Sequence, residues 1–136
     1  METQATRILV QKFLAARVAG DREAIAALLA DDASWRLPPT ATFGPFIGRE
    51  DVANALAGGV TGTIFDVSTI RRDVHKMIVE GDTAVVQQRL SATTLKGREY
   101  VNEYCWVYTC RDGKIALLEE YADTLLAARV FGTVES

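Results

Sequence analysis

Histidine and cysteine are scarce in this sequence of 136 residues, which contains one histidine and two cysteines. Cys105 and Cys110 lie five positions apart on one predicted strand. Their side chains should therefore point to opposite faces, with the Cα atoms ~16 Å apart, too far for a disulfide within the chain. A single histidine without a nearby cysteine pair argues against a zinc site. We expect no metal, no cofactor and no internal disulfide.

The sequence also lacks an excess of positive charge and any long apolar run. Its formal net charge is −3, and it has no basic face, which argues against a nucleic-acid partner. No apolar run approaches the ~20 residues that a membrane span requires. The polar N-terminal residues lead directly into a predicted helix, so we expect no signal peptide and a cytoplasmic location. The length and the apolar share of 49% suit a single domain covering residues 1–136.

The first half of the sequence shows mainly helical periodicity. Apolar side chains at helical spacing predict a first helix over residues 3–19, and Gly20 and Asp21 provide the end of this helix and the cap of the next. Shorter helices are predicted over 22–30 and 49–57. A short strand with Trp35 is predicted over 33–37, and further strands over 63–72 and 74–79.

The second half reads as three long antiparallel strands over residues 83–95, 98–111 and 114–123. Lys96-Gly97 and Asp112-Gly113 connect them, and each turn places glycine where a positive φ is needed. After the last strand, residues 125–131 are expected to form a helix capped by Asp123.

The first of these turns determines which side chains meet. A two-residue loop sets Arg89 opposite Tyr104 and Ser91 opposite Asn102. These polar groups, interleaved with aromatic rings, are typical of a pocket lining rather than of an ordinary core.

The second turn leaves two alternatives. A two-residue loop pairs Cys105 with Glu120, whereas a three-residue loop with a bulge pairs Tyr104 with Glu120. The bulged form creates a row of Arg89, Tyr104 and Glu120 across three strands. The two-residue form would replace Glu120 by Asp123 as the pocket acid. In the bulged form the same face also carries Gln87, Ser91, Asn102 and Trp106.

Several segments, in this order and spacing, carry a resemblance to a known family. They are Gly-Pro-Phe-Ile-Gly-Arg-Glu-Asp-Val at 44–52, Gly-Asp-Thr-Ala-Val-Val at 81–86, Asp-Gly-Lys-Ile at 112–115 and Glu-Tyr-Ala-Asp-Thr at 120–124. Together with the element order they resemble the SnoaL-like branch of the nuclear-transport-factor-2-like superfamily. This resemblance implies an α+β fold, with three N-terminal helices packed on a strongly curved, mostly antiparallel sheet that forms a cone.

That superfamily includes ketosteroid isomerases, polyketide cyclases, limonene-type epoxide hydrolases and non-catalytic binding proteins, so the fold alone does not fix the function. In the epoxide hydrolases an arginine lies between two acids. By resemblance Arg89 falls on the arginine and Glu120 on one acid, but Ser91 stands where the second acid should be. Trp35 and Leu37 stand where that family has the tyrosine and asparagine that hold its water. We therefore do not expect the two-acid mechanism, although the resemblance favours the bulged turn.

Two functional hypotheses follow. In the first, the protein is an enzyme on a small apolar oxygenated molecule, with Glu120 as general acid or base and Arg89 or Tyr104 stabilising an oxyanion. In the second, the polar row only binds a ligand or serves assembly, and Arg89 and Glu120 form a buried ion pair that fixes the strand register. The residues expected to contact the ligand in either case are Trp35, Phe46, Gln87, Ser91, Asn102 and Trp106.

Two further surfaces have predicted positions. The apolar loop 40–48, which contains Phe43 and Phe46, is expected either over the mouth of the pocket or folded onto the core. The outer face of the long strands is half apolar, and nothing in the chain remains to cover it, so we expect a homodimer through this face. The outer-face residues are Val101, Glu103, Cys105, Val107, Thr109, Ile115, Leu117, Glu119 and Tyr121. The single histidine, His75, is expected at a polar surface edge.

Overall fold

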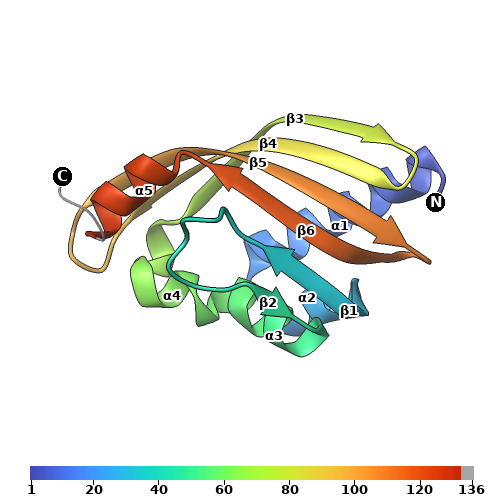
Figure 1. Ribbon diagram of the computed structural model, residues 1–136, viewed down its shortest axis with the longest axis horizontal. Coiled ribbons are helices and arrows are strands. Elements are labelled where there is room, and N and C mark those ends of the chain that lie inside the picture. The colour runs from blue at the N-terminus through green and yellow to red at the C-terminus, as the bar shows by residue number, and fades with distance from the viewer. Residues whose placement is uncertain (133–136) are drawn as a thin grey trace.

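Two helices begin the chain, and the structure, a computed structural model that describes residues 1–132, shows them beneath a curved sheet (Figure 1). α1 (Thr3–Ala19) buries the stripe of Leu9, Val10 and Phe13 and ends at Gly20, whose φ of 65° permits the left-handed cap. α2 (Arg22–Ala27) begins at Asp21, whose carboxylate accepts a hydrogen bond from the Ala24 N–H. The first helix is confirmed in full.

A six-stranded sheet in the order β2-β1-β6-β5-β4-β3 forms the rest of the scaffold. Its strands are β1 (Leu29–Arg36), β2 (Phe46–Ile47), β3 (Arg71–Glu80), β4 (Thr83–Thr93), β5 (Glu99–Arg111) and β6 (Lys114–Ala122). β1 runs parallel to β6, and every other neighbouring pair is antiparallel. The sheet bends over the helices, which confirms the predicted α+β plan with a curved, mostly antiparallel sheet (Figure 1).

Strand pairing shortens the second predicted helix. The helix was expected to reach residue 30, but α2 ends at Ala27 and Leu29 pairs with Ile115 of β6. The Ile115 N–H donates to the Leu28 carbonyl at 2.8 Å. The segment therefore satisfies its backbone groups through the sheet, which overrides its local helical periodicity.

The segment between the third helix and β3 differs most from expectation. α3 (Arg49–Asn54) continues into η1 (Ala55–Gly59), followed by α4 (Thr61–Ile64) and η2 (Val67–Thr69), so the strand predicted over 63–72 is wrong except for its end. The β-branched residues there suggested a strand. Local hydrogen bonds favour helical turns instead, since the Asp66 carboxylate accepts from the Ser68 N–H and the Thr63 hydroxyl donates to the Val60 carbonyl.

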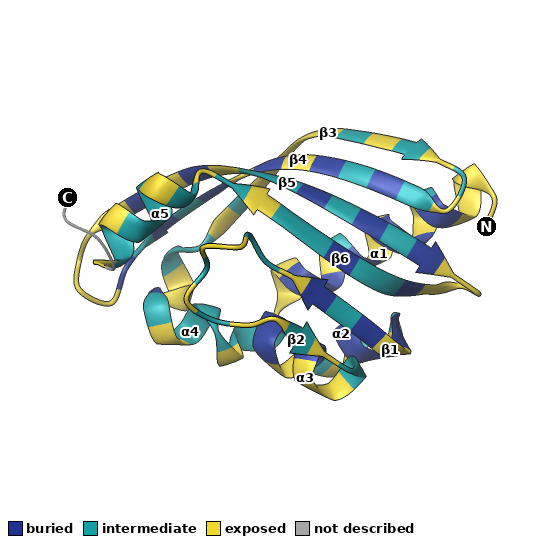
Figure 2. Cartoon of the chain, viewed as in Figure 1, coloured by how far each residue is buried: buried dark blue, intermediate teal, exposed yellow. Residues whose placement is uncertain are grey.

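Two apolar clusters form the core. Buried positions recur along the long strands, as Figure 2 shows. The larger cluster joins α1, α2 and α3 to the sheet. The smaller lies under α5 (Thr124–Phe131), where Phe65, Tyr100 and Phe131 pack with ring centroids 5.0–5.7 Å apart. Asp123 caps α5 by accepting from the Leu126 N–H, as predicted. Tyr104 packs against both clusters, so the space between them borders its ring.

The first long hairpin has a different loop from the one predicted. The Thr94 N–H donates to the Arg98 carbonyl and the Gly97 N–H to the Thr94 carbonyl, so the loop has three residues and Gly97 adopts a φ of 84°. The extra residue shifts the register by one position. Arg89 therefore lies opposite Glu103, and the predicted pairing of Arg89 with Tyr104 is wrong.

The second hairpin has the two-residue loop, but a bulge follows it. Arg111 pairs with Lys114 around the loop, and the register then shifts because Ala116 is an extra residue in β6. Glu120 therefore lies opposite Trp106, which is neither of the two predicted pairings. The bulge also turns Ile115 into the core, where it is fully buried, instead of onto the outer face.

Candidate functional site

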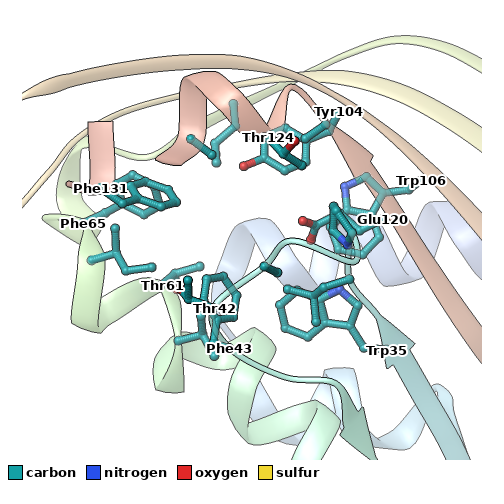
Figure 3. Close-up of a pocket in the computed structure, with 18 of the residues that line it drawn as sticks. Trp35, Thr42, Phe43, Thr61, Phe65, Tyr104, Trp106, Glu120, Thr124 and Phe131 are labelled. Carbon is teal, nitrogen blue, oxygen red and sulfur yellow. The ribbon is translucent and has the colours of Figure 1, made fainter. Parts of the chain in front are cut away.

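A cavity lies between the inner face of the long strands, the loop after β1, α4 and α5 (Figure 3). The centre of a water molecule can reach about 100 Å³ of it, far more than one water requires, so it suits a small organic molecule. Most of the wall is apolar and aromatic. The residues that line it are Arg17, Trp35, Leu37, Pro38, Thr40, Ala41, Thr42, Phe43, Val60, Thr61, Ile64, Phe65, Arg72, Gln88, Leu90, Tyr104, Trp106, Glu120, Ala122, Thr124, Ala127, Ala128 and Phe131.

Glu120 is the only acidic side chain among the described residues that line this cavity. It comes from β6 and its carboxyl group points into the cavity (Figure 3). Burial raises the pKa of Glu120 to about 7, and the nearby charge of Arg17 and the indole of Trp35 lower it only in part. The Trp35 N–H approaches the carboxyl group but does not reach hydrogen-bond geometry with it. A carboxyl group with this pKa can both accept and donate a proton at neutral pH.

Tyr104 lies on the same inner face, on β5, and belongs to a chain of hydrogen bonds. Its hydroxyl is 2.6 Å from the hydroxyl of Tyr100, which also accepts a hydrogen bond from the Asn102 side-chain amide at 2.8 Å. Asn102 is fixed in turn by donating to the Asp123 carbonyl at 3.0 Å. Burial, followed by the proximity of Tyr100 and Glu120, raises the pKa of Tyr104 above its ordinary value, so its phenol stays protonated.

Two arginines reach the cavity, one from α1 and one from β3. Arg17 extends from the last turn of α1 and is 7% exposed, with its guanidinium carbon 5.1 Å from the centre of the Trp106 ring. Arg72 extends from β3, where it lies opposite Leu90. Burial, followed by the charge of Arg17, lowers the pKa of Arg72 to about 10. The two guanidinium groups are therefore close enough to repel each other.

Several buried polar atoms of the lining have no hydrogen-bond partner within residues 1–132. They are Nε of Arg17, the indole nitrogens of Trp35 and Trp106, and the side-chain oxygen of Gln88. A buried polar group without a partner costs free energy, so such groups in a native structure call for an explanation. Three of the four are N–H donors, and each belongs to a residue that a cavity ligand would contact.

Four of the predicted site residues line the cavity: Trp35, Tyr104, Trp106 and Glu120. Two others support the lining from behind. Phe46 stacks on Trp35 with ring centroids 5.1 Å apart, and Asn102 is buried in the tyrosine network. The segment 40–48 takes both predicted positions, because Phe43 lines the cavity while Phe46 packs against the core.

The remaining three, Gln87, Arg89 and Ser91, lie on the outer face because of the shift in the first hairpin. The row of Arg89, Tyr104 and Glu120 is therefore not formed. Arg89 instead donates from Nε to Glu103 at 2.7 Å, and His75 lies 3.1 Å from the same carboxylate. These side chains are exposed, so the cluster is a surface ion pair, and His75 lies at the surface as predicted.

Arg17, Arg72 and Gln88 were not among the predicted site residues, although a signal for Arg17 was present. Arg17 follows Val10 and Phe13 at helical spacing and so continues the apolar stripe of α1. A charged residue on such a stripe points to a functional position. Gln88 and Arg72 gave no such signal, because the register of the hairpins decides which face of the sheet their side chains occupy.

The described part of the chain offers no site for a metal ion made from three or more histidine, cysteine, aspartate or glutamate side chains. Cys105 and Cys110 are both free thiols. No helix within residues 1–132 is long and apolar enough to cross a membrane.

Comparison with solved structures places this fold among known ones. An NTF2-like protein from Burkholderia thailandensis is 23% identical and superimposes with a TM-score of 0.82 over 96% of this chain and 98% of its own. TerC, crystallised with polyporic acid, is 20% identical, with a TM-score of 0.79 over 94% and 98% of the two chains. A protein with a ketosteroid isomerase-like fold from Catenulispora acidiphila, in complex with trimethylamine, is 17% identical, with a TM-score of 0.69 over 83% of each chain.

Sequence comparison gives a family. A search of curated proteins finds no match. The family model described as a SnoaL-like domain matches residues 10–118, a span that runs from α1 into β6 and includes Arg17, Trp35, Tyr104 and Trp106. The helices, the curved sheet and the cavity between them are thus those of a protein that belongs to the SnoaL-like domain family.

Proposed function

We propose that the protein is an enzyme that carries out acid–base chemistry on a small apolar oxygenated molecule, of the isomerase, cyclase or hydrolase type, with Glu120 as the proton-transfer group. One observation carries this proposal. Glu120 is a buried carboxyl group in a mostly aromatic cavity, and burial raises its pKa to about 7. A general acid or base is most effective when its pKa lies near the working pH.

The geometry suits proton removal beside a carbonyl group. The Glu120 carboxylate takes a proton from the carbon next to the carbonyl, and the electron pair of the broken C–H bond moves to the carbonyl oxygen. Tyr104 donates a hydrogen bond to that oxygen as negative charge develops. Glu120 then returns the proton at another carbon of an isomerase substrate, so that no atom is gained or lost.

The tyrosine network supports the role of Tyr104. Because the Tyr100 hydroxyl accepts from Asn102, its own proton is available to the Tyr104 oxygen. Tyr104 can then direct its proton into the cavity, where Figure 3 shows its side chain beside the space that Glu120 also borders. A positioned donor of this kind stabilises an oxyanion without reorganising during the reaction.

Two neighbours in structure support the choice of molecule. TerC was crystallised with polyporic acid, and the Catenulispora acidiphila protein has a ketosteroid isomerase-like fold. A flat, oxygenated molecule fits a cavity walled by Trp35, Phe65 and Trp106, since aromatic walls favour stacking against such a surface.

The test compares Glu120→Gln with Glu119→Gln on a panel of enones, lactones and epoxides. Glu119 is the adjacent residue but faces outward and pairs with Arg36, so its variant is a matched control. We expect Glu120→Gln to lower turnover by roughly 10²–10⁴-fold while Glu119→Gln keeps it. Equal turnover in the wild type and Glu120→Gln would contradict the proposal.

The alternative is a binding module without catalysis. The indole N–H groups of Trp35 and Trp106, which lack partners within residues 1–132, favour a ligand that accepts hydrogen bonds, whether or not it reacts. Panel compounds that raise the melting temperature without being converted would support this alternative.

A further inference from the structure

We propose that Arg17 and Arg72 form an anion-binding subsite of this cavity, so that its ligand is an apolar molecule that carries a carboxylate group. The inference deepens the proposed function by naming the substrate class, and it rests on that function only for the claim that the bound acid reacts.

The first observation is the buried charge of Arg17. The side chain is 93% shielded from solvent, and no carboxylate within residues 1–132 lies within ion-pair distance of it. Its Nε–H also lacks a hydrogen-bond acceptor there. Its charge is compensated only in part, by the ring of Trp106, the nearby Tyr108 hydroxyl and the Glu120 carboxyl group, which feels the charge of Arg17 from beyond ion-pair distance. A buried cation is costly unless it is paired, so this guanidinium is poised for an anion.

The second observation is the position of Arg72 beside it. Arg72 also lines the cavity, and in the described part of the chain it makes neither an ion pair nor a side-chain hydrogen bond. Both arginines also line the adjoining surface depression, and burial, followed by the repulsive charge of Arg17, lowers the pKa of Arg72. Two neighbouring guanidinium groups with free N–H donors match the two oxygens of one carboxylate.

The charge balance of the lining favours an anion. Arg17 and Arg72 are cations, and Glu120 is the only carboxyl group among the described lining residues. The cavity thus carries a net positive charge whether or not Glu120 is protonated. Asp73, which follows Arg72 in the chain, is exposed, lines an adjoining surface depression, and pairs with neither arginine in the described chain.

The rest of the lining defines the body of the ligand. Phe43, Phe65, Trp35 and Phe131 offer aromatic surface, and the indole N–H of Trp106 offers one more donor close to Arg17. A molecule with a flat apolar body and one acidic end therefore satisfies the aromatic wall and the two arginines together.

The experiment uses 3-phenylpropanoate and 3-phenylpropanamide, which have the same shape and differ in charge. The chain has two tryptophans, Trp35 and Trp106, and both line the cavity, so intrinsic fluorescence reports binding at this place. Titration calorimetry supplies the dissociation constants. We expect the acid to bind at least roughly tenfold more tightly than the amide, since hydrogen bonds to charged groups are the stronger ones.

Variants assign the effect to the arginines. Arg72→Gln should lose most of the preference for the acid and keep the affinity for the amide, whereas the exposed Arg89→Gln makes the same change in net charge and should behave as the wild type. Arg17→Lys keeps the charge but not the planar fork, and we expect a partial loss of the preference. Circular dichroism checks that each variant is folded.

The inference is overturned if the wild type binds acid and amide equally, a comparison that needs no variant to fold. It is also overturned if Arg72→Gln weakens both compounds alike. Glu120→Gln separates it from the proposed function, because this variant should bind the acid at least as well as the wild type. If the protein prefers the acid but shows no turnover that depends on Glu120, the anion-binding subsite is supported and the proposed function is contradicted. If it converts neutral compounds but does not prefer the acid, the proposed function is supported and the subsite is contradicted.

Discussion

Glu120 lies directly opposite Trp106 on the neighbouring strand, and the Trp106 ring lies 5.8 Å from that of Trp35, centre to centre. The carboxyl group is thereby placed against indole rings instead of water. Desolvation of this kind disfavours the charged form of an acid, which is why the pKa of Glu120 rises to about 7. The same relationship suits Glu120 to the proton transfer that we propose, and it makes the ionised carboxylate destabilising at neutral pH.

We predict that Glu120→Gln flattens the pH dependence of stability. The pKa of Glu120 in the folded protein, about 7, lies above its ordinary value of 4.5, so between these values the folded protein holds a proton that the unfolded chain releases. The contribution of Glu120 to the free energy of unfolding is fully present below pH 4.5 and is lost as the pH rises through 7. This loss is at most about 3 kcal/mol. Urea unfolding at pH 5, 6, 7 and 8 measures it.

The glutamine variant should then be more stable than the wild type at pH 8. Glu119→Gln, on the outer face, should retain the wild-type slope. A wild-type stability that stays constant from pH 5 to pH 8 would show that Glu120 is ionised throughout and that its carboxyl group is solvated.

Tyr104→Phe should lower turnover by roughly 10²-fold, because it removes one hydrogen-bond donor to the developing oxyanion. Tyr100→Phe should have a smaller effect, since Tyr100 acts only through Tyr104. Steady-state kinetics on a substrate found with the panel measures both. If both variants fold and Tyr100→Phe loses more turnover than Tyr104→Phe, the prediction that Tyr100 acts through Tyr104 is contradicted.

Arg89→Gln and Glu103→Gln should leave ligand binding and turnover unchanged. Both residues are about half exposed on the outer face, where ion pairs contribute little and salt weakens them further. Titration calorimetry and steady-state kinetics measure binding and turnover, and thermal melts in low and high salt measure what the ion pair contributes to stability. A large loss of activity in either variant would mean that the outer face takes part in the reaction.

We predict that the protein forms a homodimer through the outer face of β5 and β6. Val101 and Tyr121 are half exposed on this face, with Val107 and Leu117 between them in the same layer. We expect the two copies to bury roughly 1,200 Å² or more of accessible surface in total, which is the area that a stable interface buries. Light scattering should give twice the chain mass of 14.9 kDa, and Tyr121→Glu should shift the mass toward the monomer. A monomer at micromolar concentration would refute the prediction.

The sequence was enough to predict the elements whose signals are local. The stripe of Leu9, Val10 and Phe13 with Gly20 behind it defined α1, and Asp123 defined the start of α5. The long strands followed from β-branched runs and two glycine turns. Each of these signals depends on neighbours within a few positions, so it can be read from the sequence alone. The order of the elements, together with the family resemblance, then predicted the curved α+β fold.

Only the tertiary structure decided which side chains share the cavity. Side chains alternate along a strand, so the one extra residue in the loop at Gly97 moved Arg89 outward and Gln88 inward. The bulge at Ala116 restored Glu120 to the face of Tyr104 and Trp106. Arg17 and Arg72 line the same cavity because α1 packs under the sheet against β3. Proximity across 55 positions of sequence has no local signal, since it depends on how two separately formed elements dock.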